Sequence, residues 1–577
     1  TAPESAALAI KMGCDVNCGN TYLHLLRALE DGLITEDDIT TAAERLFTTR
    51  FMLGEFDENC EYNSIPYEVV ECPEHLTLSE EAARRSVVLL KNDDALLPLA
   101  EGTRVAVIGD FAEKPRYQGA GSSAVNSIKV DTFLDCLNDS GLHSVGFAPG
   151  FDRQGKPDAA KQAEAVALAA EADAVLLCLG LDEIKESEGL DRADMKLADN
   201  QIELLQAVRE ANPNTVVIVN AGASLETPWL AHCKALVYGA LGGQAGAGAM
   251  VDVLTGKINP GGKLAETWAN AYADTPARDH FAGPGRTVQY REGLYVGYRY
   301  YQTAGVPVAF PFGHGLSYTQ FAYSDLHADA HSAALTVTNT GDRAGAEIVQ
   351  LYVAKPNAEI FRPAQELKAF AKVQLAAGES KTVTLTLDDK AFRYWNTRTD
   401  SWEVEGGTYE LRVGASSADI RLSAAVEVIG TDALNPYAGK ALPHYRSGKV
   451  HTVPDAEWET LLGRPIPDDR VKIDRNMTLG ELNHGRSPLG WLVWAVLTAL
   501  LNASYKKGKP DLNVLFQYNM PLRALAKMTN GAISMGMVDG IVMEVQGFWV
   551  IGLVRVIFEA VKNVILNAQL ENRLRNS

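Results

Sequence analysis

Short apolar runs alternate with helical stretches between residues 77 and 321. The runs are of the kind found in strands buried on both faces, and each is followed or closed by Gly or Asn: Val105–Ile108, Ala174–Leu179, Thr215–Asn220 and Ala235–Tyr238. Helical spacing is found between or before them, in Ser79–Lys91, Asp158–Ala172 and Asn200–Ala211. This alternation predicts an α/β sandwich, with a mostly parallel sheet and helices on both faces. Because ligands in such sheets bind at the carboxyl ends of the strands, we expect a site in the loops after Ile108, Leu179 and Asn220.

From about residue 322 the apolar period changes from helical spacing to two. Apolar side chains alternate with polar ones in three runs, at Leu335 and Val337, at Val349, Leu351 and Val353, and at Val383, Leu385 and Leu387. Turn sequences such as Asn339–Asp342 and Gly406–Gly407 separate the runs. Short alternating strands over about 100 residues predict an all-β sandwich, which we place at residues 322–430.

Residues 1–55 predict a loop and two helices, and residues 56–76 predict a linker. Thr35 followed by Asp38 resembles a capping box that opens a helix, and Gly54 marks its end. A segment of this size with so few strands does not form a domain, so we expect residues 1–55 to be the end of a larger one. The linker is irregular and contains two prolines and two cysteines.

Residues 431–577 differ in character and predict a partly helical carboxyl-terminal extension. The apolar run Leu489–Leu501 is shorter than the roughly 20 residues of a membrane span. The segment Ile541–Leu566 looks helical, with Arg555, Glu559 and Lys562 on one face. We expect these helices to pack on the body of the protein or across a homo-oligomer interface. The alternatives are an interfacial membrane helix and, less in keeping with the length, a spanning one.

Composition narrows the possible partners. A chain of 577 residues is expected to form three or four units, and a net charge of −20 argues against a nucleic-acid partner. The seven cysteines are odd in number and too sparse for a disulfide framework, so we expect reduced thiols and a cytoplasmic location. No signal peptide is visible at the amino-terminal end of the sequence.

The segment Lys185–Arg192 carries the most informative cluster of charged residues. It follows a predicted strand and places Glu186, Glu188, Asp191 and Arg192 around Gly189. A general acid for a sugar leaving group needs a carboxyl whose pKa lies near the working pH, and such a polar loop can supply one. The alternative from local composition is an ordinary solvated charged loop.

Other candidate features point away from cofactors. Gln118–Ser123 and Gly242–Gly246 are glycine-rich, but neither completes a dinucleotide fingerprint, so close packing is the favoured interpretation. The aromatic residues between Tyr290 and Tyr318 are expected to seal an interface between domains rather than to stack on sugars. The histidines show no metal-ligand spacing, and no nucleophilic-serine elbow or phosphate-binding loop is found. We therefore predict neither a cofactor nor a metal.

Several of these segments together resemble glycoside hydrolase family 3. The segment Lys185–Arg192, with Leu197 and Gln201 after it, is similar to the acid/base loop of that family. Further similar segments follow in the same order: Gly242–Leu264, Tyr290–Tyr300 and Phe310–Thr319, and, in the β-sandwich, Glu366–Phe370 and Gly407–Tyr409. The resemblance covers about residues 1–430.

The resemblance implies a barrel domain, then the α/β sandwich at residues 77–321 and a fibronectin type III-like domain at residues 322–430. Residues 1–55 would be a remnant of the TIM-like barrel, because Met12–Gly19 resembles its last strand region. Members of the family are retaining enzymes that use two carboxyl groups about 5 Å apart. The resemblance gives Glu188 the role of general acid/base, with Glu186 as the fallback, and Asp191 and Arg192 would orient the loop.

The same resemblance places the nucleophilic aspartate before Thr1. Asp15 matches a different motif and is not nominated, so we expect little hydrolysis from this chain alone. The expected function of the intact protein is exo-hydrolysis that releases terminal β-D-glucose from β-linked oligosaccharides or glycosides. A β-xylosidase is the nearest alternative, and a non-catalytic carbohydrate-binding or scaffold subunit is the alternative from another class.

Overall fold

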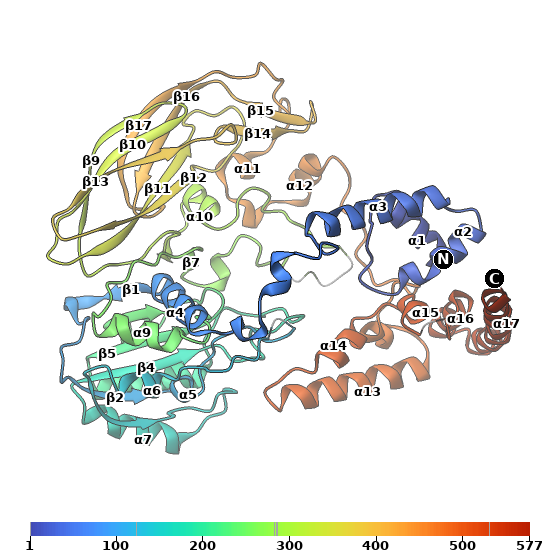
Figure 1. The fold of residues 1–577 in the computed structure, drawn as a ribbon, viewed down its shortest axis with the longest axis horizontal. Helices are drawn as coiled ribbons and strands as arrows, with labels where there is room; N and C mark the ends of the chain where they lie inside the picture. The colour runs from blue at the N-terminus through green and yellow to red at the C-terminus, as the bar shows by residue number, and fades with distance from the viewer. Residues whose placement is uncertain (1, 123, 282, 284–286, 530, 577) are drawn as a thin grey trace. The chain divides into compact units, whose positions relative to one another are not determined.

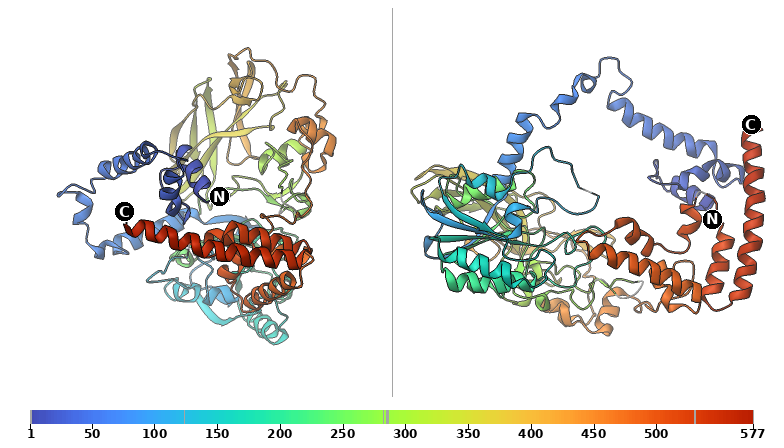
Figure 2. Two further views of the ribbon diagram at one scale, coloured as in Figure 1. Left: turned by 90° about the vertical axis from the view of Figure 1, so that its right-hand side faces the viewer. Right: turned by 90° about the horizontal axis from the view of Figure 1, so that it is seen from below.

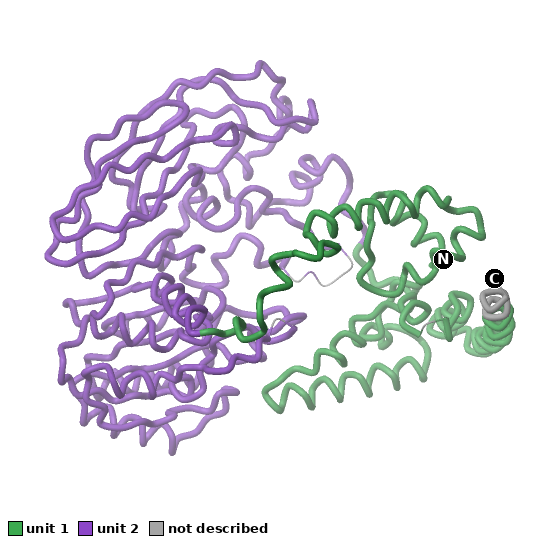
Figure 3. The backbone as a smooth tube through the Cα atoms, viewed as in Figure 1, with its two compact units in different colours: residues 1–72, 469–577 green, residues 73–468 purple. Residues whose placement is uncertain are grey.

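The computed structural model describes residues 2–122, 124–281, 283, 287–529 and 531–576, so Ser123 of the glycine-rich loop lies outside the described residues. The chain divides into two compact units (Figure 3). One unit joins Thr1–Cys72 with Asp469–Ser577, and the other is Pro73–Asp468. The predicted extension 431–577 is therefore divided between the two units.

A six-stranded sheet forms the centre of the α/β domain in the order β1-β6-β5-β4-β2-β3 (Figure 1). Its strands are β1 Val88–Asn92, β2 Arg104–Ile108, β3 His143–Ala148, β4 Ala174–Gly180, β5 Thr215–Asn220 and β6 Ala235–Tyr238. All neighbouring pairs are parallel except β1 with β6. The helices beside the sheet form two groups. In the first, α9 Gly246–Leu254 packs against α4 Pro73–Ser86 and α6 Phe133–Leu137; in the second, α7 Ala159–Ala170 packs against α8 Asp199–Ala211. The predicted α/β sandwich is confirmed.

The central strands form because their side chains are almost all apolar and are stabilised by burial in the core. Every residue of β4 and β5 is buried, as their unbroken apolar sequences predict. The predicted helix Ser79–Lys91 is wrong beyond Ser86, because Val88–Asn92 is the antiparallel edge strand β1. An apolar run of this length has no periodicity that separates a strand from a buried helical turn. Strand β3 was not predicted, since its sequence includes His, Ser and Gly.

The order of the strands creates a switch point between β2 and β4. The chain leaves β2 for β3 on one side of the sheet, whereas it leaves β4 for β5 on the other side. The loops after two neighbouring strands therefore diverge, which opens a crevice at the carboxyl ends of those strands. The loop after β2 contains the short helix α5 Asp110–Glu113, and the loop after β4 contains Glu188.

The second domain is the predicted β-sandwich. One sheet has the order β13-β10-β9 and the other β12-β11-β16-β17. The strands are β9 Phe321–Ala328, β10 Ser332–Asn339, β11 Gly345–Ala354, β12 Glu366–Leu375, β13 Ser380–Thr386, β16 Gly407–Gly414 and β17 Ile420–Val428, beside the hairpin β14 Arg393–Asn396 and β15 Ser401–Val404. Burial alternates strictly along β10, so the period of two does mark one face turned to the core.

Aromatic side chains seal the junction between the two domains, as the sequence predicts. Tyr298 opens helix α10 (Tyr298–Ala304), and its ring meets Tyr352 of the β-sandwich edge to face at 5.8 Å. The short strands β7 Trp268–Ala269 and β8 Val308–Phe310 pair beside it. Helices α11 Pro443–Ser447 and α12 Asp455–Leu462 complete this junction. The buried Tyr445 hydroxyl donates to the Arg291 carbonyl at 2.9 Å, so residues near 445 belong with this body.

The other unit is helical in the residues that the structure describes. It begins with α1 Ala2–Lys11, α2 Leu25–Glu30 and α3 Glu36–Met52, one helix more than predicted. The capping box of Thr35 and Asp38 is confirmed, with the Thr35 amide donating to the Asp38 carboxylate at 2.8 Å. Its later helices are shown in Figure 2: α13 Pro488–Tyr505, α14 Leu512–Tyr518, α15 Ala524–Met528, α16 Met535–Val545 and α17 Trp549–Asn576.

Ile541–Leu566 is helical as predicted, but it is divided between two separate helices, α16 and α17. The chain turns between them at Gly547, whose φ of +102° is a conformation that suits glycine. The periodicity on each side is helical, and only the turn between them escaped prediction. All seven cysteines are free thiols in this structure.

Candidate active site

Two loops at the switch point are joined by backbone contacts. Ala120, after β2, forms a parallel bridge with Ser187, after β4. The amide of Glu188 donates to the carbonyl of Ala120 at 2.9 Å. The glycine-rich segment and the charged segment, separated by more than 60 residues in sequence, therefore lie side by side at the carboxyl ends of the strands.

The carboxylate of Glu188 is held by Ser122. Glu188 Oε2 accepts a hydrogen bond from the Ser122 amide at 2.9 Å and a second one from the Ser122 hydroxyl. Gly121 permits this approach, because an added Cβ would lie 2.5 Å from both Cβ and Oε2 of Glu188. The remainder of Glu188 is exposed to solvent. The glycine-rich loop thus supports a carboxyl group and has no need of a phosphate.

Glu186 is a fixed carboxylate in the same loop. Both of its oxygens accept from the Gly222 amide at 2.9 Å, which ties the loop after β4 to the loop after β5. The Arg116 guanidinium lies 3.9 Å from it, and the side chain is mostly buried. These contacts give Glu186 a structural role, and they leave Glu188 as the carboxyl of the pair that is open to a ligand.

Arg116 is the residue at the centre of this arrangement that sequence reasoning missed. It is 3% exposed, and its guanidinium donates to three backbone carbonyls: Gln118 at 3.0 Å, Leu181 at 3.0 Å and Glu186 at 2.8 Å. A buried cation is costly unless every donor finds an acceptor, and here the acceptors come from both loops. A lone arginine between Pro115 and Tyr117 gives no signal of this in the sequence.

Arg153 forms a second clamp between the same two loops. Its guanidinium donates to Asp110 at 2.9 Å and to Glu183 at 2.7 Å, and it lies 4.4 Å above the ring of Phe111. Burial by itself would raise the pKa of Glu183, but the contact with Arg153 outweighs burial and lowers it. Glu183 therefore serves as an ionised anchor.

The other two predicted site residues differ in their surroundings. Asp191 is exposed, whereas Arg192 donates to the Ser224 carbonyl at 3.3 Å and so reaches the loop after β5.

The structure also adds Glu266, whose carboxyl contacts Ser224. Although this side chain reaches solvent, burial by the surrounding protein raises the pKa of Glu266, and the charge of Glu186 adds to the effect. Glu266 follows a glycine-rich turn, and neither periodicity nor a motif in the sequence marks it as a site residue.

Replacing Arg116 with lysine should loosen the joined loops. A lysine ammonium cannot reach three carbonyls in the geometry of the guanidinium, and each charged hydrogen bond contributes about 1.5–3 kcal/mol. We expect the free energy of unfolding of the α/β domain to fall by about 2–4 kcal/mol. Hydrogen exchange measured by mass spectrometry should quicken first in residues 186–190, where the Glu188 amide is bound to Ala120.

The control for this variant is Arg104→Lys, whose side chain is exposed at the start of β2. It should leave both the stability and the exchange pattern unchanged. Equal exchange in residues 186–190 of Arg116→Lys and the parent chain would show that the guanidinium does not hold the loop.

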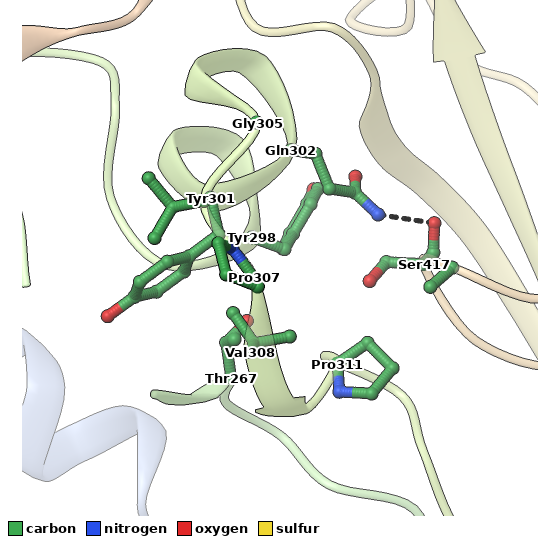
Figure 4. Close-up of a pocket in the computed structure, with 11 residues that line it drawn as sticks. Thr267, Tyr298, Tyr301, Gln302, Gly305, Pro307, Val308, Pro311 and Ser417 are labelled. Atoms are coloured by element: carbon green, nitrogen blue, oxygen red, sulfur yellow. Dashed lines mark hydrogen bonds between the residues drawn. The ribbon is translucent and has the colours of Figure 1, made fainter. Parts of the chain in front are cut away.

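A cavity of about 320 Å³ lies away from Glu188, at the junction of the two domains (Figure 4). It is lined by one face of helix α10 and by neighbouring residues of both domains, among them Thr267, Tyr298, Pro311 and Ser417. Gln302 bridges the junction by donating to the Ser417 carbonyl. None of the residues that line this cavity carries a carboxyl group.

Comparison with known proteins identifies both domains. Residues 87–318 match the glycosyl hydrolase family 3 C-terminal domain, and residues 347–417 match the fibronectin type III-like domain. The chain is 40% identical over 425 residues to thermostable beta-glucosidase B of Acetivibrio thermocellus, covering 72% of this chain and 55% of that protein. It is 40% identical over 453 residues to exo-alpha-(1->6)-L-arabinopyranosidase of Bifidobacterium longum, covering 75% and 59%.

A solved structure extends the likeness. The chain is similar to the crystal structure of a GH3 beta-glucosidase from Bifidobacterium adolescentis, with a TM-score of 0.69 and 36% sequence identity. That likeness covers 84% of this chain and 67% of the solved chain. The chain spans little more than half the length of the curated relatives it matches.

Proposed function

Because this chain belongs to glycoside hydrolase family 3, we propose that it supplies the general acid/base of a retaining exo-β-glucosidase. The observation that carries the proposal is the Glu188 carboxyl group. It is exposed at the switch point, and one of its oxygens accepts a hydrogen bond from Ser122. Arg116 holds the same loop by donating to the Glu186 carbonyl. An exposed carboxyl on a rigid loop can meet the oxygen of a glycosidic bond.

In the proposed reaction Glu188 acts twice. It first donates its proton to the glycosidic oxygen as the bond to the anomeric carbon breaks and a carboxylate nucleophile bonds to that carbon. It then takes a proton from water as the water oxygen bonds to the anomeric carbon and releases the nucleophile. We propose that the nucleophile comes from the barrel domain of the whole protein, outside this chain. The two carboxyl groups must come within about 5 Å of each other.

The relatives indicate a second candidate substrate. Proteins named exo-alpha-(1->6)-L-arabinopyranosidase are 40% and 43% identical to this chain, as close as the glucosidase. An α-L-arabinopyranoside therefore replaces the β-xyloside as the first alternative to test. The loop that holds Glu188 serves either sugar, because general acid catalysis acts on the leaving oxygen.

The experiment is a substrate panel assayed on this chain and on the whole protein that contains it. The panel consists of 4-nitrophenyl β-D-glucopyranoside, α-L-arabinopyranoside and β-D-xylopyranoside. We expect the whole protein to have its highest kcat/KM on the glucoside and this chain to show little activity on any of them. A preference for the arabinoside would change the substrate assignment. Binding of these sugars without hydrolysis by the whole protein would support the scaffold alternative instead.

We also propose that the protein works in a reducing compartment such as the cytoplasm. The support is the state of its seven cysteines, which are all free, including Cys178 in the centre of strand β4. Burial raises the pKa of the Cys178 thiol, which keeps it protonated and unreactive. Thiol titration of the denatured protein directly after extraction should find seven free groups.

A further inference from the structure

Helix α17 exposes many of its apolar side chains, whereas two of its asparagines face inward. The Asn563 and Asn567 amides donate to the Gly531 carbonyl at 2.6 and 3.0 Å, on the side that faces α16. Many apolar side chains of this helix are more than half exposed, among them Val550, Ile551, Leu553, Val554, Ile557, Phe558, Val561, Val564, Ile565 and Leu566. The charged side chains of Arg555 and Lys562 are also exposed. A surface helix in water turns its apolar side chains to the core instead.

Helix α13 also exposes apolar side chains. Leu489, Leu492, Val496 and Leu500 follow one another at helical spacing, and each is at least 50% exposed. The helix has no charged residue, and its length of 18 residues and mean hydropathy of 1.3 would suffice to cross a membrane. Only 17% of it is buried, so it is not the core helix of this unit. Apolar surfaces of this extent mark an interaction site.

The charge of the same segment indicates what covers these helices. Residues 469–577 contain thirteen Lys and Arg against eight Asp and Glu, a net charge of +5 in a protein whose total is −20. Lys506, Lys507 and Lys509 follow α13 directly. Trp491 and Trp549 lie in the first turns of α13 and α17, and both are about half exposed. Tryptophan at helix ends and lysine clusters beside apolar helices are typical of proteins at the boundary of an anionic bilayer.

We propose that residues 469–577 bind the surface of a lipid bilayer that carries anionic headgroups. Helices α13 and α17 lie in the boundary between headgroups and acyl chains, with their outward apolar faces buried there. The lysines after α13 remain at the level of the phosphates. A surface position fits α17 better than a span, because Arg555, Glu559 and Lys562 interrupt its apolar sequence. The sequence had favoured packing on protein over membrane contact, and it could not show which faces of these helices are left uncovered.

Flotation of the full chain with vesicles tests the proposal. One set of vesicles contains phosphatidylcholine alone, and the other contains phosphatidylcholine with phosphatidylglycerol. We expect the chain to float with the anionic vesicles at least about tenfold better than with the neutral ones, and we expect salt to weaken binding. A combined variant, Lys506→Glu with Lys507→Glu and Lys509→Glu, should lose that preference. Val496→Glu should lower binding to both kinds of vesicle.

Phe370→Glu is the matched control, because Phe370 is an apolar side chain even more exposed than Val496 but lies on the β-sandwich. It should float like the parent chain, and circular dichroism should show that all variants keep their helices. Failure of the folded parent chain to float with anionic vesicles overturns the proposal. So does flotation that Val496→Glu and the lysine variant leave unchanged. A dimer in solution that Val496→Glu separates, with no flotation, would assign these faces to a second copy of the chain instead.

Discussion

Glu188→Gln in the whole protein should lower kcat/KM on methyl β-D-glucoside by about 10²–10⁴-fold, the usual contribution of a general acid/base. Glutamine keeps the size of the side chain and can still accept from the Ser122 amide, but it has no proton to give to the leaving oxygen. The loss should be far smaller for bond cleavage in 2,4-dinitrophenyl β-D-glucoside, because that leaving group departs without protonation. Pre-steady-state kinetics on both substrates measure the difference.

The control is Glu203→Gln, on the exposed side of helix α8 and away from the three loops. It should leave both substrates unaffected. If Glu186→Gln instead of Glu188→Gln shows the dependence on the leaving group, the acid/base role belongs to Glu186. A loss in Glu188→Gln that is equal for both substrates would indicate a defect in folding or binding and would contradict the assignment.

Gly109→Ala should destabilise the α/β domain by about 2–5 kcal/mol. Gly109 directly follows strand β2, and an added Cβ would lie 2.1 Å from the carbonyl oxygen of Cys178 in β4. That oxygen belongs to the backbone of a fully buried strand, so it cannot move aside without disturbing the parallel sheet. Its φ of +117° adds strain for any residue with a Cβ. Urea unfolding followed by tryptophan fluorescence measures the change.

The variant Gly102→Ala separates the effect of the steric clash from the effect of backbone strain. Gly102 also has a positive φ, of +79°, but an added Cβ would meet no atom within 4 Å. This variant should cost only the backbone strain, about 1 kcal/mol. Equal effects at the two positions would show that the close approach of β2 to β4 contributes nothing to the stability.

In residues 469–577 the sequence pattern predicted the helices but did not predict which of their faces are exposed. Helical spacing correctly predicted that residues near Leu489–Leu501 and Ile541–Leu566 are helical, because spacing reflects the local geometry of the backbone. It missed the turn at Gly547, since one glycine inside an apolar sequence is compatible with a continuous helix. It also could not tell that polar Asn563 faces α16 while its apolar neighbours face outward. Which face is covered depends on neighbours that the sequence of one helix does not contain.

The two domain types, the central strands and the loop that carries Glu188 could all be predicted from the amino-acid sequence. These features follow from local patterns, because apolar runs that alternate with helical stretches are typical of a parallel sheet, and a period of two is typical of a half-buried strand. The folded chain was needed to show that Ser122 and Gly121 support Glu188, that Glu186 accepts from the Gly222 amide, and that buried Arg116 joins the loops. These residues come from different crossovers of the sheet. They meet because the strand order places β2 beside β4, and that order arises from packing across the whole sheet.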